Sequence, residues 1–394
     1  MGVLSDINDM APELTAIRRR IHAHPETGFE EHATAALVAE VLTGLGLEVT
    51  TGIGRTGVVG TLQGRGGPGR RIGLRADMDA LPIVEANHFD HVSTRSGKMH
   101  ACGHDGHTAM LLGAAKSLAA DPDFAGTVDF IFQPAEEGLG GGAAMIADGL
   151  FDRFPCDEVY GLHNMPDVPK GTFAIRAGPM MAASDSFEIE VRGKGGHAAW
   201  PHSTLDPVSG AAQIVVALQT IVSRNVAPLD AAVVSVTVLK AGTAFNVVPD
   251  TALIGGTFRS LTRETRKLLR ERIEQTARGV AQGLGLTIDW RHHEIMPATI
   301  NHARQTATAI AAAAEVVGAA NVRTDIAASM GSEDFGYMLE ERPGAYIFIG
   351  QGDGGAASVM IHNPSYDFND AILPVGASYW VRLARLALED RRNG

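Results

Sequence analysis

Apolar and polar positions follow two different patterns along this chain of 394 residues. In the first part, short apolar runs alternate with segments that have apolar residues at helical spacing. The runs lie at 57–64, 71–77, 126–135 and 157–164. The helical segments lie at 11–23, 30–45 and 106–120. This alternation predicts a mixed, largely parallel sheet whose faces are covered by helices.

The pattern changes near residue 183. Residues 185–193 alternate polar and apolar side chains with a period of two, which is typical of a half-exposed strand. A helix, two strands, a second helix and a last strand are then expected. They lie at about 206–224, 231–242, 251–260, 263–283 and 286–294. The order βαββαβ predicts a ferredoxin-like α+β domain.

The last part of the chain resumes the first pattern at 302–317, 345–350 and 375–390. We therefore predict an α/β domain built from residues 1–182 and 294–394, interrupted by an inserted domain of residues 183–293. Three consecutive domains are the alternative. We favour the insertion because the segment after residue 294 is short for a core of its own.

Composition excludes several classes of function. No run of about 18 apolar residues is present, so no membrane span is expected. The net charge of −12 disfavours nucleic acid as a partner. Two cysteines and the lack of a signal-like start predict a cytoplasmic protein without a disulfide framework.

Residues 99–108 concentrate side chains that can bind a metal. His100, Cys102, His104 and His107 fall within eight positions, and sulfur and imidazole suit zinc, cobalt, manganese or nickel. A closed structural zinc site would need more than one cysteine here. Polar histidines that cap a helix are the alternative explanation.

Two adjacent carboxylates follow an apolar strand in the segment QPAEEG. Glu136 and Glu137 lie where that strand should end, and the carboxyl ends of strands host the site in open α/β sheets. Neighbours on an extended chain point in opposite directions, so one glutamate can bind a metal while the other faces a reacting water. His163 and His362, each near a predicted strand end or turn, bring the ligands to the number that two metal ions need.

Two glycine motifs invite other readings. The segment Gly52–Gly57 fits the dinucleotide pattern G-x-G-x-x-G, but a strand follows it where a helix is required. The glycine run after Glu137 lacks the Lys and Ser or Thr of a P-loop. Neither motif therefore predicts a nucleotide site.

Eight segments together carry a family resemblance. They are RADMDALPI, HACGHDGHT, QPAEEG, LHNMP, GKGGHAAWPH, AGTAFNVVPD, GTFRS and GSEDF. The chain resembles the metal-dependent aminoacylase and carboxypeptidase superfamily over nearly its whole length. Within it, the chain is similar to the amidohydrolase branch of hippurate hydrolases, N-acyl-amino-acid amidohydrolases and auxin-conjugate hydrolases. Asp77-Met-Asp79 and Cys102 stand where the wider superfamily has His-x-Asp and a bridging Asp, as is typical of this branch.

The resemblance implies a role for each candidate residue of the catalytic domain. Two divalent metal ions (zinc, manganese, cobalt or nickel) would share the thiolate of Cys102. His104 and His163 would complete the site of one ion, and Glu137 and His362 the site of the other. Glu136 would be the general base toward a metal-activated water. Asp79 is expected to orient His104 or His163, because metal-bound histidines usually donate their second N–H to a carboxylate or carbonyl.

The resemblance also assigns residues of the inserted domain, which it makes a lid and dimerisation domain. His197 would reach the active site of the partner subunit and stabilise the oxyanion. Asn246 and Arg259 would hold the carboxylate of the substrate, for which the planar fork of arginine is suited. A homodimer or homotetramer through the lid is therefore expected.

The expected activity is cleavage of the amide bond of a small N-acyl amino acid, such as a hippurate-like conjugate. A dipeptidase or carboxypeptidase of the same superfamily is the alternative. A metal-containing binding protein without activity is a further alternative, but such a protein has no use for the second glutamate, Glu136.

Overall fold

The computed structural model describes residues 2–389, which form two compact units. The larger unit takes in the described residues of Met1–Met180, Ile300–Ala327 and Asp334–Gly394. The smaller unit comprises Met181–Thr299 and Ala328–Glu333. Within the described range, no helix is both long and apolar enough to cross a membrane.

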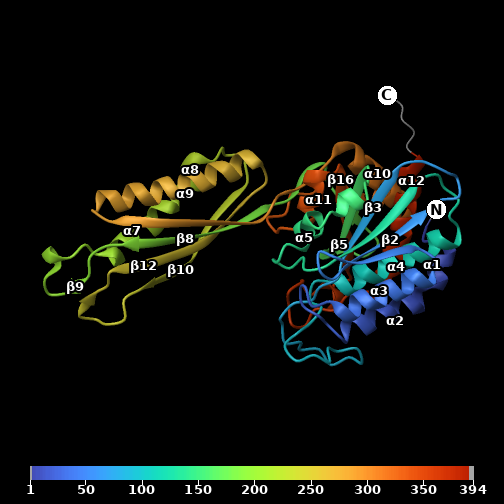
Figure 1. Ribbon diagram of the computed structural model, residues 1–394, viewed down its shortest axis with the longest axis horizontal. Helices are drawn as coiled ribbons and strands as arrows, with labels where there is room; N and C mark the ends of the chain where they lie inside the picture. The colour runs from blue at the N-terminus through green and yellow to red at the C-terminus, as the bar shows by residue number, and fades with distance from the viewer. Residues whose placement is uncertain (1, 390–394) are drawn as a thin grey trace. The chain divides into compact units, whose positions relative to one another are not determined.

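An eight-stranded mixed sheet forms the centre of the larger unit (Figure 1). Its strands are β1 (Glu48–Ile53), β2 (Gly57–Gln63), β3 (Arg71–Asp77), β4 (Thr127–Gln133), β5 (Glu158–Pro169), β6 (Phe173–Ala174), β15 (Val322–Arg323) and β16 (Gly344–Gly352). The order is β1-β2-β4-β3-β5-β16-β6-β15, and the central pairs β4–β3, β3–β5 and β5–β16 are parallel. Antiparallel pairs such as β1–β2 and β2–β4 lie toward the edge. The predicted mixed, largely parallel sheet is confirmed.

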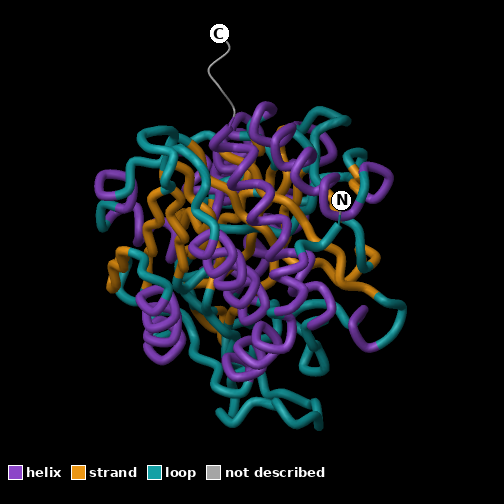
Figure 2. Tube along the Cα trace, turned by 90° about the vertical axis from the view of Figure 1, so that its right-hand side faces the viewer, coloured by secondary structure: helices purple, strands orange, loops and turns teal. Residues whose placement is uncertain are grey.

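Helices surround the sheet of the larger unit (Figure 2). They are α1 (Ser5–Asp9), α2 (Ala11–His22), α3 (His32–Gly44), α4 (His104–Ala120), α5 (Gly141–Ala147), α6 (Leu150–Arg153), α10 (Ala303–Val317), α11 (Phe335–Glu341) and α12 (Leu373–Glu389). One group is centred on α4, which contacts α2, α3, α12 and strand β3. A second group is formed by α5 and α11, which contact each other and the strands β4 and β5.

Strand β3 shows how the two helix groups take opposite faces of the sheet. Ile72, Leu74 and Ala76 are buried in the core cluster that also contains the apolar residues of α4 and α12. Arg75 points the other way, and its guanidinium carbon lies 5.8 Å from the ring centre of Phe335 on α11. Successive side chains of a strand alternate between faces, so the two groups cover the two sides.

The smaller unit contains a four-stranded antiparallel sheet in the order β10-β12-β8-β13. Its elements are β8 (Ala183–Arg192), α7 (Pro207–Leu218), α8 (Thr220–Asn225), β10 (Ala232–Ala241), β12 (Thr251–Ser260), α9 (Arg263–Gly283) and β13 (Thr287–Met296). Helices α7 and α9 pack on the sheet through one apolar cluster. The predicted ferredoxin-like α+β fold is confirmed.

A two-stranded ribbon extends the smaller unit beyond one end of its sheet. It consists of β9 (Gly196–His197) and β11 (Val247–Val248), which precedes the first residue of β12 (Figure 1). The chain passes from the larger to the smaller unit within β7 (Gly178–Met181) and returns within β14 (Thr299–Asn301). Residues 328–333 cluster with the smaller unit, because Ala182 N donates to Gly331 O and Arg259 donates to Ser332.

Candidate active site and metal centre

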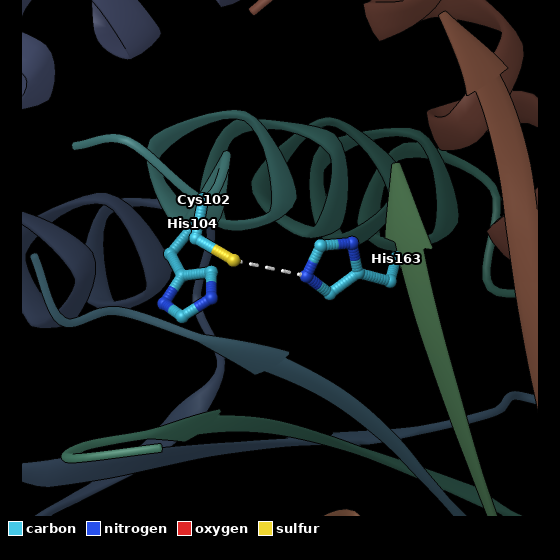
Figure 3. A group of neighbouring side chains, drawn as sticks. All are labelled: Cys102, His104 and His163. Atoms are coloured by element: carbon cyan, nitrogen blue, oxygen red, sulfur yellow. Dashed lines mark hydrogen bonds between the residues drawn. The ribbon is translucent and has the colours of Figure 1, made fainter. Parts of the chain in front are cut away.

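The candidate metal ligands of the larger unit lie on a strand of its parallel centre or in segments that follow such strands. Cys102 and His104 lie where the chain enters α4, and His163 lies on β5 (Figure 3). Glu137 follows β4, and His362 follows β16 after a loop. The carboxyl ends of parallel strands meet at one edge of a sheet, so residues up to 260 positions apart converge there.

The five predicted ligands form two groups of three that share one residue. Cys102, His104 and His163 have ligand atoms within 4.8 Å of one another, and so do Cys102, Glu137 and His362. The Sγ of Cys102 lies 3.3 Å from Nε2 of His163 (Figure 3). Nε2 of His362 lies 3.1 Å from Oε1 of Glu137. A sulfur common to both groups is the arrangement that a bridging thiolate requires.

Local backbone conformation brings these side chains together. Gly103, between two of the ligands, has a φ of 101°, and a Cβ at this position would lie 2.1 Å from Oδ1 of Asn164. Only glycine fits such a position without strain. His362 has a φ of 63°, and its N–H donates to the carbonyl of Ala101 at 2.7 Å. This bond holds His362 beside Cys102.

The two buried histidines are oriented through their second ring nitrogen. Nδ1 of His104 lies 3.2 Å from Oδ1 of Asp79, and Nδ1 of His163 lies 2.6 Å from the carbonyl oxygen of Asn164. Asp79 therefore contacts His104 and not His163. Nε2 of His104 is buried and has no hydrogen-bond partner within residues 2–389. A carboxylate or carbonyl on one ring nitrogen, which leaves the other nitrogen to bind an ion, is typical of metal-ligating histidines.

The electrostatics of the cluster favour a cation. Burial, and then the carboxylates of Glu137 and Glu136, raise the pKa of the Cys102 thiol well above its ordinary value. Burial alone would lower the pKa of His104, but Asp77 and the hydrogen bond to Asp79 raise it to about 10. Neighbouring carboxylates contribute to both shifts, and divalent metal ions would compensate this negative charge.

Glu136 is positioned next to this cluster. Its side chain is buried, and its oxygen forms a group with ligand atoms of His104 and Glu137 within 4.8 Å. Its backbone N–H donates to Oδ1 of Asp79 at 3.0 Å, and Oε1 accepts from the N–H of Asp334 at 3.4 Å. The structure thus brings Glu136, Glu137 and His104 together.

The other two histidines of residues 99–108 have different partners, and His107 forms with Asp77 and His104 a further group that could hold a metal. Nδ1 of His107 contacts Asp77 at 2.6 Å, and its Nε2 contacts Oδ1 of Asn164 at 2.7 Å. Neither ring nitrogen of His100 has a hydrogen-bond partner in the described part of the chain. Burial lowers the pKa of His100 to about 4, which keeps its ring neutral.

A network of buried hydrogen bonds that the sequence analysis did not predict surrounds the candidate ligands. Asn164 donates to Gln351 and Tyr366 while its Oδ1 faces His107. Asp77 also accepts from Arg75 at 2.7 Å. The sequence signals were the place of Asp77 in the Asp77-Met-Asp79 motif and the place of Asn164 directly after His163.

The three predicted lid residues do not come together within one chain. His197 on β9 is exposed and pairs with Val247, and the carbonyl of Asn246 accepts from the N–H of Ala198 at 3.0 Å. These residues lie on the ribbon that precedes β12. Arg259 lies at the far end of β12, half-buried, and donates to Ser332 at 2.7 Å. The eight residue steps of β12 from Thr251 to Arg259 span on the order of 25 Å.

Comparison with known proteins decides the family. The model of peptidase family M20/M25/M40 matches residues 73–386. The chain belongs to this family. It is 46% identical to the hippurate hydrolase of Campylobacter jejuni, over 98% of this chain and 99% of that protein. It is 39% identical to the N-acetyl-L-cysteine deacetylase of Bacillus subtilis, over 95% of this chain and 88% of that protein.

A solved structure gives the same fold. The crystal structure of the YXEP protein of Bacillus subtilis, a dinuclear metal-binding peptidase from the M20 family, matches with a TM-score of 0.86 and 33% identity. The match covers 98% of this chain and 99% of that one. This M20 protein is therefore a metal-binding hydrolase that acts on amide bonds, and its cofactors are divalent metal ions. The predicted membership of the amidohydrolase branch is confirmed.

Proposed function

We propose that this M20 enzyme hydrolyses the amide bond of N-acyl amino acids, including hippurate-like conjugates, with Glu136 as the general base. One observation carries the proposal. Cys102 belongs to two three-residue ligand groups at once, and the buried Glu136 lies beside them. A purely structural metal site would need the shared sulfur but not the additional carboxylate.

The donor atoms fit two divalent ions. Cys102 would bridge them, with His104 and His163 completing one site and Glu137 and His362 the other. One sulfur and three imidazoles make zinc, cobalt, manganese or nickel suitable occupants. Bound there, the ions would act as Lewis acids toward the acyl carbonyl and make an attacking water more acidic.

Glu136 carries the proton that the reaction transfers. Its carboxylate removes a proton from water while the water oxygen forms a bond to the acyl carbon. The C–N bond then breaks, and the same carboxyl group donates that proton to the departing nitrogen. The products are a carboxylic acid, which releases its own proton at neutral pH, and a free amine. Burial of Glu136 beside the donor cluster suits this role, because a sequestered base works without competing bulk water.

The names of the relatives support the substrate class. The hippurate hydrolase and the N-acetyl-L-cysteine deacetylase both act on an amide between an acyl group and an amino acid. Both match nearly the full length of this chain. An N-acyl amino acid offers one acyl carbonyl to the site and one carboxylate for recognition, a task that Arg259 and Asn246 would share.

The geometry of the smaller unit supports a shared active site in a dimer. His197 and Asn246 lie together on one ribbon, whereas Arg259 lies at the other end of β12. One chain therefore cannot bring all three to one small substrate. We infer that His197 and Asn246 act on the site of the partner subunit, where His197 stabilises the oxyanion, and that Arg259 acts on the site of its own chain. A homodimer or homotetramer formed through this unit, acting as a lid, meets that requirement.

Replacement of the general base tests the proposal. Glu136→Gln keeps the shape of the side chain but removes the proton acceptor, so kcat for hippurate should fall at least about 100-fold. Metal content, measured by elemental analysis after dialysis, should stay at the wild-type level. Turnover near the wild-type rate would refute the role of Glu136.

A matched control and a substrate panel sharpen the test. Glu137→Gln, one residue further on, should lose metal as well as activity, because Glu137 is a proposed ligand. The panel compares hippurate, N-acetyl amino acids and a free dipeptide with zinc, manganese, cobalt and nickel. Faster turnover of the dipeptide would favour a peptidase in place of the proposed amidohydrolase.

A further inference from the structure

The segment that carries both glutamates lies outside regular secondary structure. It joins the end of β4 at Gln133 to the start of α5 at Gly141. Ala135, directly before Glu136, has a φ of 52°, in the left-handed region that residues with a Cβ rarely adopt. A strained residue at this point persists only when its surroundings hold it.

Two buried carboxylates hold three successive backbone N–H groups of this segment. Oε1 of Glu31 accepts from Ala135 N at 2.8 Å. The two oxygens of Asp79 accept from Glu136 N and Glu137 N, each at 3.0 Å. Glu31 and Asp79 are both almost fully buried. Each backbone N–H from 135 to 137 therefore donates a hydrogen bond to a side chain that is distant in the sequence.

Glu31 is itself fixed in place. Its Oε2 accepts from the hydroxyl of Thr56 at 2.5 Å. The preceding residues pack closely on the same segment, since a Cβ at Gly28 would lie 3.0 Å from Cβ of Ala135. The hydrogen-bond partners of the Glu31 carboxylate among the described residues are neutral groups, namely the Ala135 amide, the Thr56 hydroxyl and the backbone N–H of Glu31 itself. A carboxylate buried without a cation is costly, so its bonds must serve the fold or the site.

We propose that Glu31 is a positioning residue for the hydrolytic site. By accepting from Ala135 N, it fixes the left-handed turn that directs Glu136 toward the reacting water and Glu137 toward the metal cluster. This inference rests on the proposed role of Glu136 as general base. Glu31 contacts neither substrate nor metal in this proposal. It affects kcat only by holding Glu136 in the position that the reaction needs.

Three variants of the full-length, metal-loaded enzyme test the proposal. Glu31→Ala removes the acceptor, and kcat should fall about 10- to 100-fold, as expected for a displaced catalytic group, with KM within about twofold. Glu31→Gln keeps one acceptor for Ala135 N and presents its amide to the Thr56 hydroxyl, so it should retain at least about half of kcat. Glu26→Ala is the matched control, because Glu26 also accepts backbone N–H groups, from Ala33 and Thr34. Its kcat should stay at the wild-type value.

Amide hydrogen exchange gives a readout that does not depend on turnover. In Glu31→Ala, the peptide that contains residues 135–137 should exchange at least about tenfold faster than in wild type, whereas Glu31→Gln should leave it protected. Glu26→Ala should change exchange only at the start of α3. If Glu31→Ala does not fold, Thr56→Val loosens the same carboxylate and should raise exchange in the 135–137 peptide while lowering kcat a few-fold.

Two results would overturn the proposal. One is unchanged kcat in Glu31→Ala despite faster exchange at 135–137, which would make the bond purely structural. The other is failure of Glu31→Gln to restore the rate of Glu31→Ala. The proposed function fails by a different result, full activity of Glu136→Gln, which leaves the exchange data on Glu31 unaffected.

Discussion

Cys102 supplies the only sulfur among the candidate ligands, and it is the residue on which both groups depend. Without it, each three-residue group loses its shared ligand, and only His104 with His163 and Glu137 with His362 are left. Burial and neighbouring carboxylates raise the pKa of this thiol, and a bound cation would favour its thiolate form. The occupancy of the two sites should therefore be coupled through one atom.

Replacement of this sulfur should abolish metal binding at both positions. Cys102→Ala is expected to lose most of the bound metal and at least about 100-fold in kcat, since a bridging ligand is removed from both sites. Elemental analysis after dialysis and a hippurate assay measure the two effects. Cys156→Ala is the control, because this second buried cysteine contacts Asp129 and not the cluster. Full metal content in Cys102→Ala would contradict the bridge.

Sequence spacing could place the ligands in one segment but could not separate neighbours within it. His100, His104 and His107 have the same chemistry and lie within eight positions. What separates them is their partners, namely Asp79 for His104 and Asp77 with Asn164 for His107. These contacts join residues 25 to 57 positions apart. No local pattern encodes such contacts, so the distinction came from the family resemblance and not from spacing.

At the scale of elements, α2 and α4 are joined by a buried charged network. Arg18 and His22 of α2 both contact Asp105, which lies in the first turn of α4 next to a candidate ligand. Nδ1 of His22 lies 2.8 Å from Asp105, and its Nε2 lies 3.1 Å from Glu85. Burial alone would lower the pKa of His22, but the hydrogen bonds to Asp105 and Glu85 raise it above its ordinary value.

This network predicts a pH-dependent contribution to stability. A histidine whose pKa is raised by folding stabilises the folded state fully below its unfolded pKa of about 6.5, and this stabilisation is lost as pH rises through the folded value. His22→Gln should therefore lower the free energy of unfolding by about 1–3 kcal/mol near pH 6, and by less as pH rises toward about 9. Urea denaturation of variant and wild type at each pH measures the difference.

A neighbouring histidine provides the control for that measurement. His24→Gln changes an exposed histidine two residues further on, and its effect should be small at every pH. A difference between His22→Gln and wild type that grows with rising pH would contradict the assigned direction. Such a result would mean that burial, and not the two carboxylates, dominates the pKa of His22.

Helices and buried strands of the fold could be predicted because their apolar spacing is local. Strand β1 could not, since most of its residues are exposed or half-buried and it lacks an apolar run. The glycines at 52, 54 and 57 turn the chain from β1 into β2 as a hairpin. A strand follows these glycines, whereas a dinucleotide site needs a helix there to bind the phosphates. We therefore interpret the glycines as turn residues and not as a nucleotide site.

At the scale of the whole molecule, a single sequence does not show which subunit supplies each residue of an active site. The sequence motifs assign His197, Asn246 and Arg259 to an active site. They do not show whether each residue acts on the site of its own chain or on that of a partner subunit. The structure separates them onto the two ends of β12. Residues so far apart can contact one substrate only if a second copy of the chain supplies some of them. Periodicity and spacing within one sequence do not describe such an assembly. The role of the smaller unit as a dimerising lid is therefore a prediction that an experiment in solution tests.

Subunit complementation tests this arrangement directly. Glu136→Gln and His197→Ala homodimers should each be nearly inactive. In a heterodimer of the two chains, the site of the His197→Ala chain keeps its own Glu136 and receives His197 from the other chain. Random pairing makes half of the dimers mixed, each with one intact site of two, so co-expression should restore about a quarter of wild-type activity.

The same experiment with Arg259→Ala tests whether Arg259, unlike His197, acts on the active site of its own chain. If Arg259 acts on the site of its own chain, a heterodimer with Glu136→Gln has one site without the base and one without the arginine, and no activity returns. Restoration in the His197 pairing but not in the Arg259 pairing would therefore show that the ribbon acts across the dimer while the far end of β12 acts within it. Restoration in neither pairing would place His197 outside the partner's site, and the separation of these residues in the smaller unit would need another explanation.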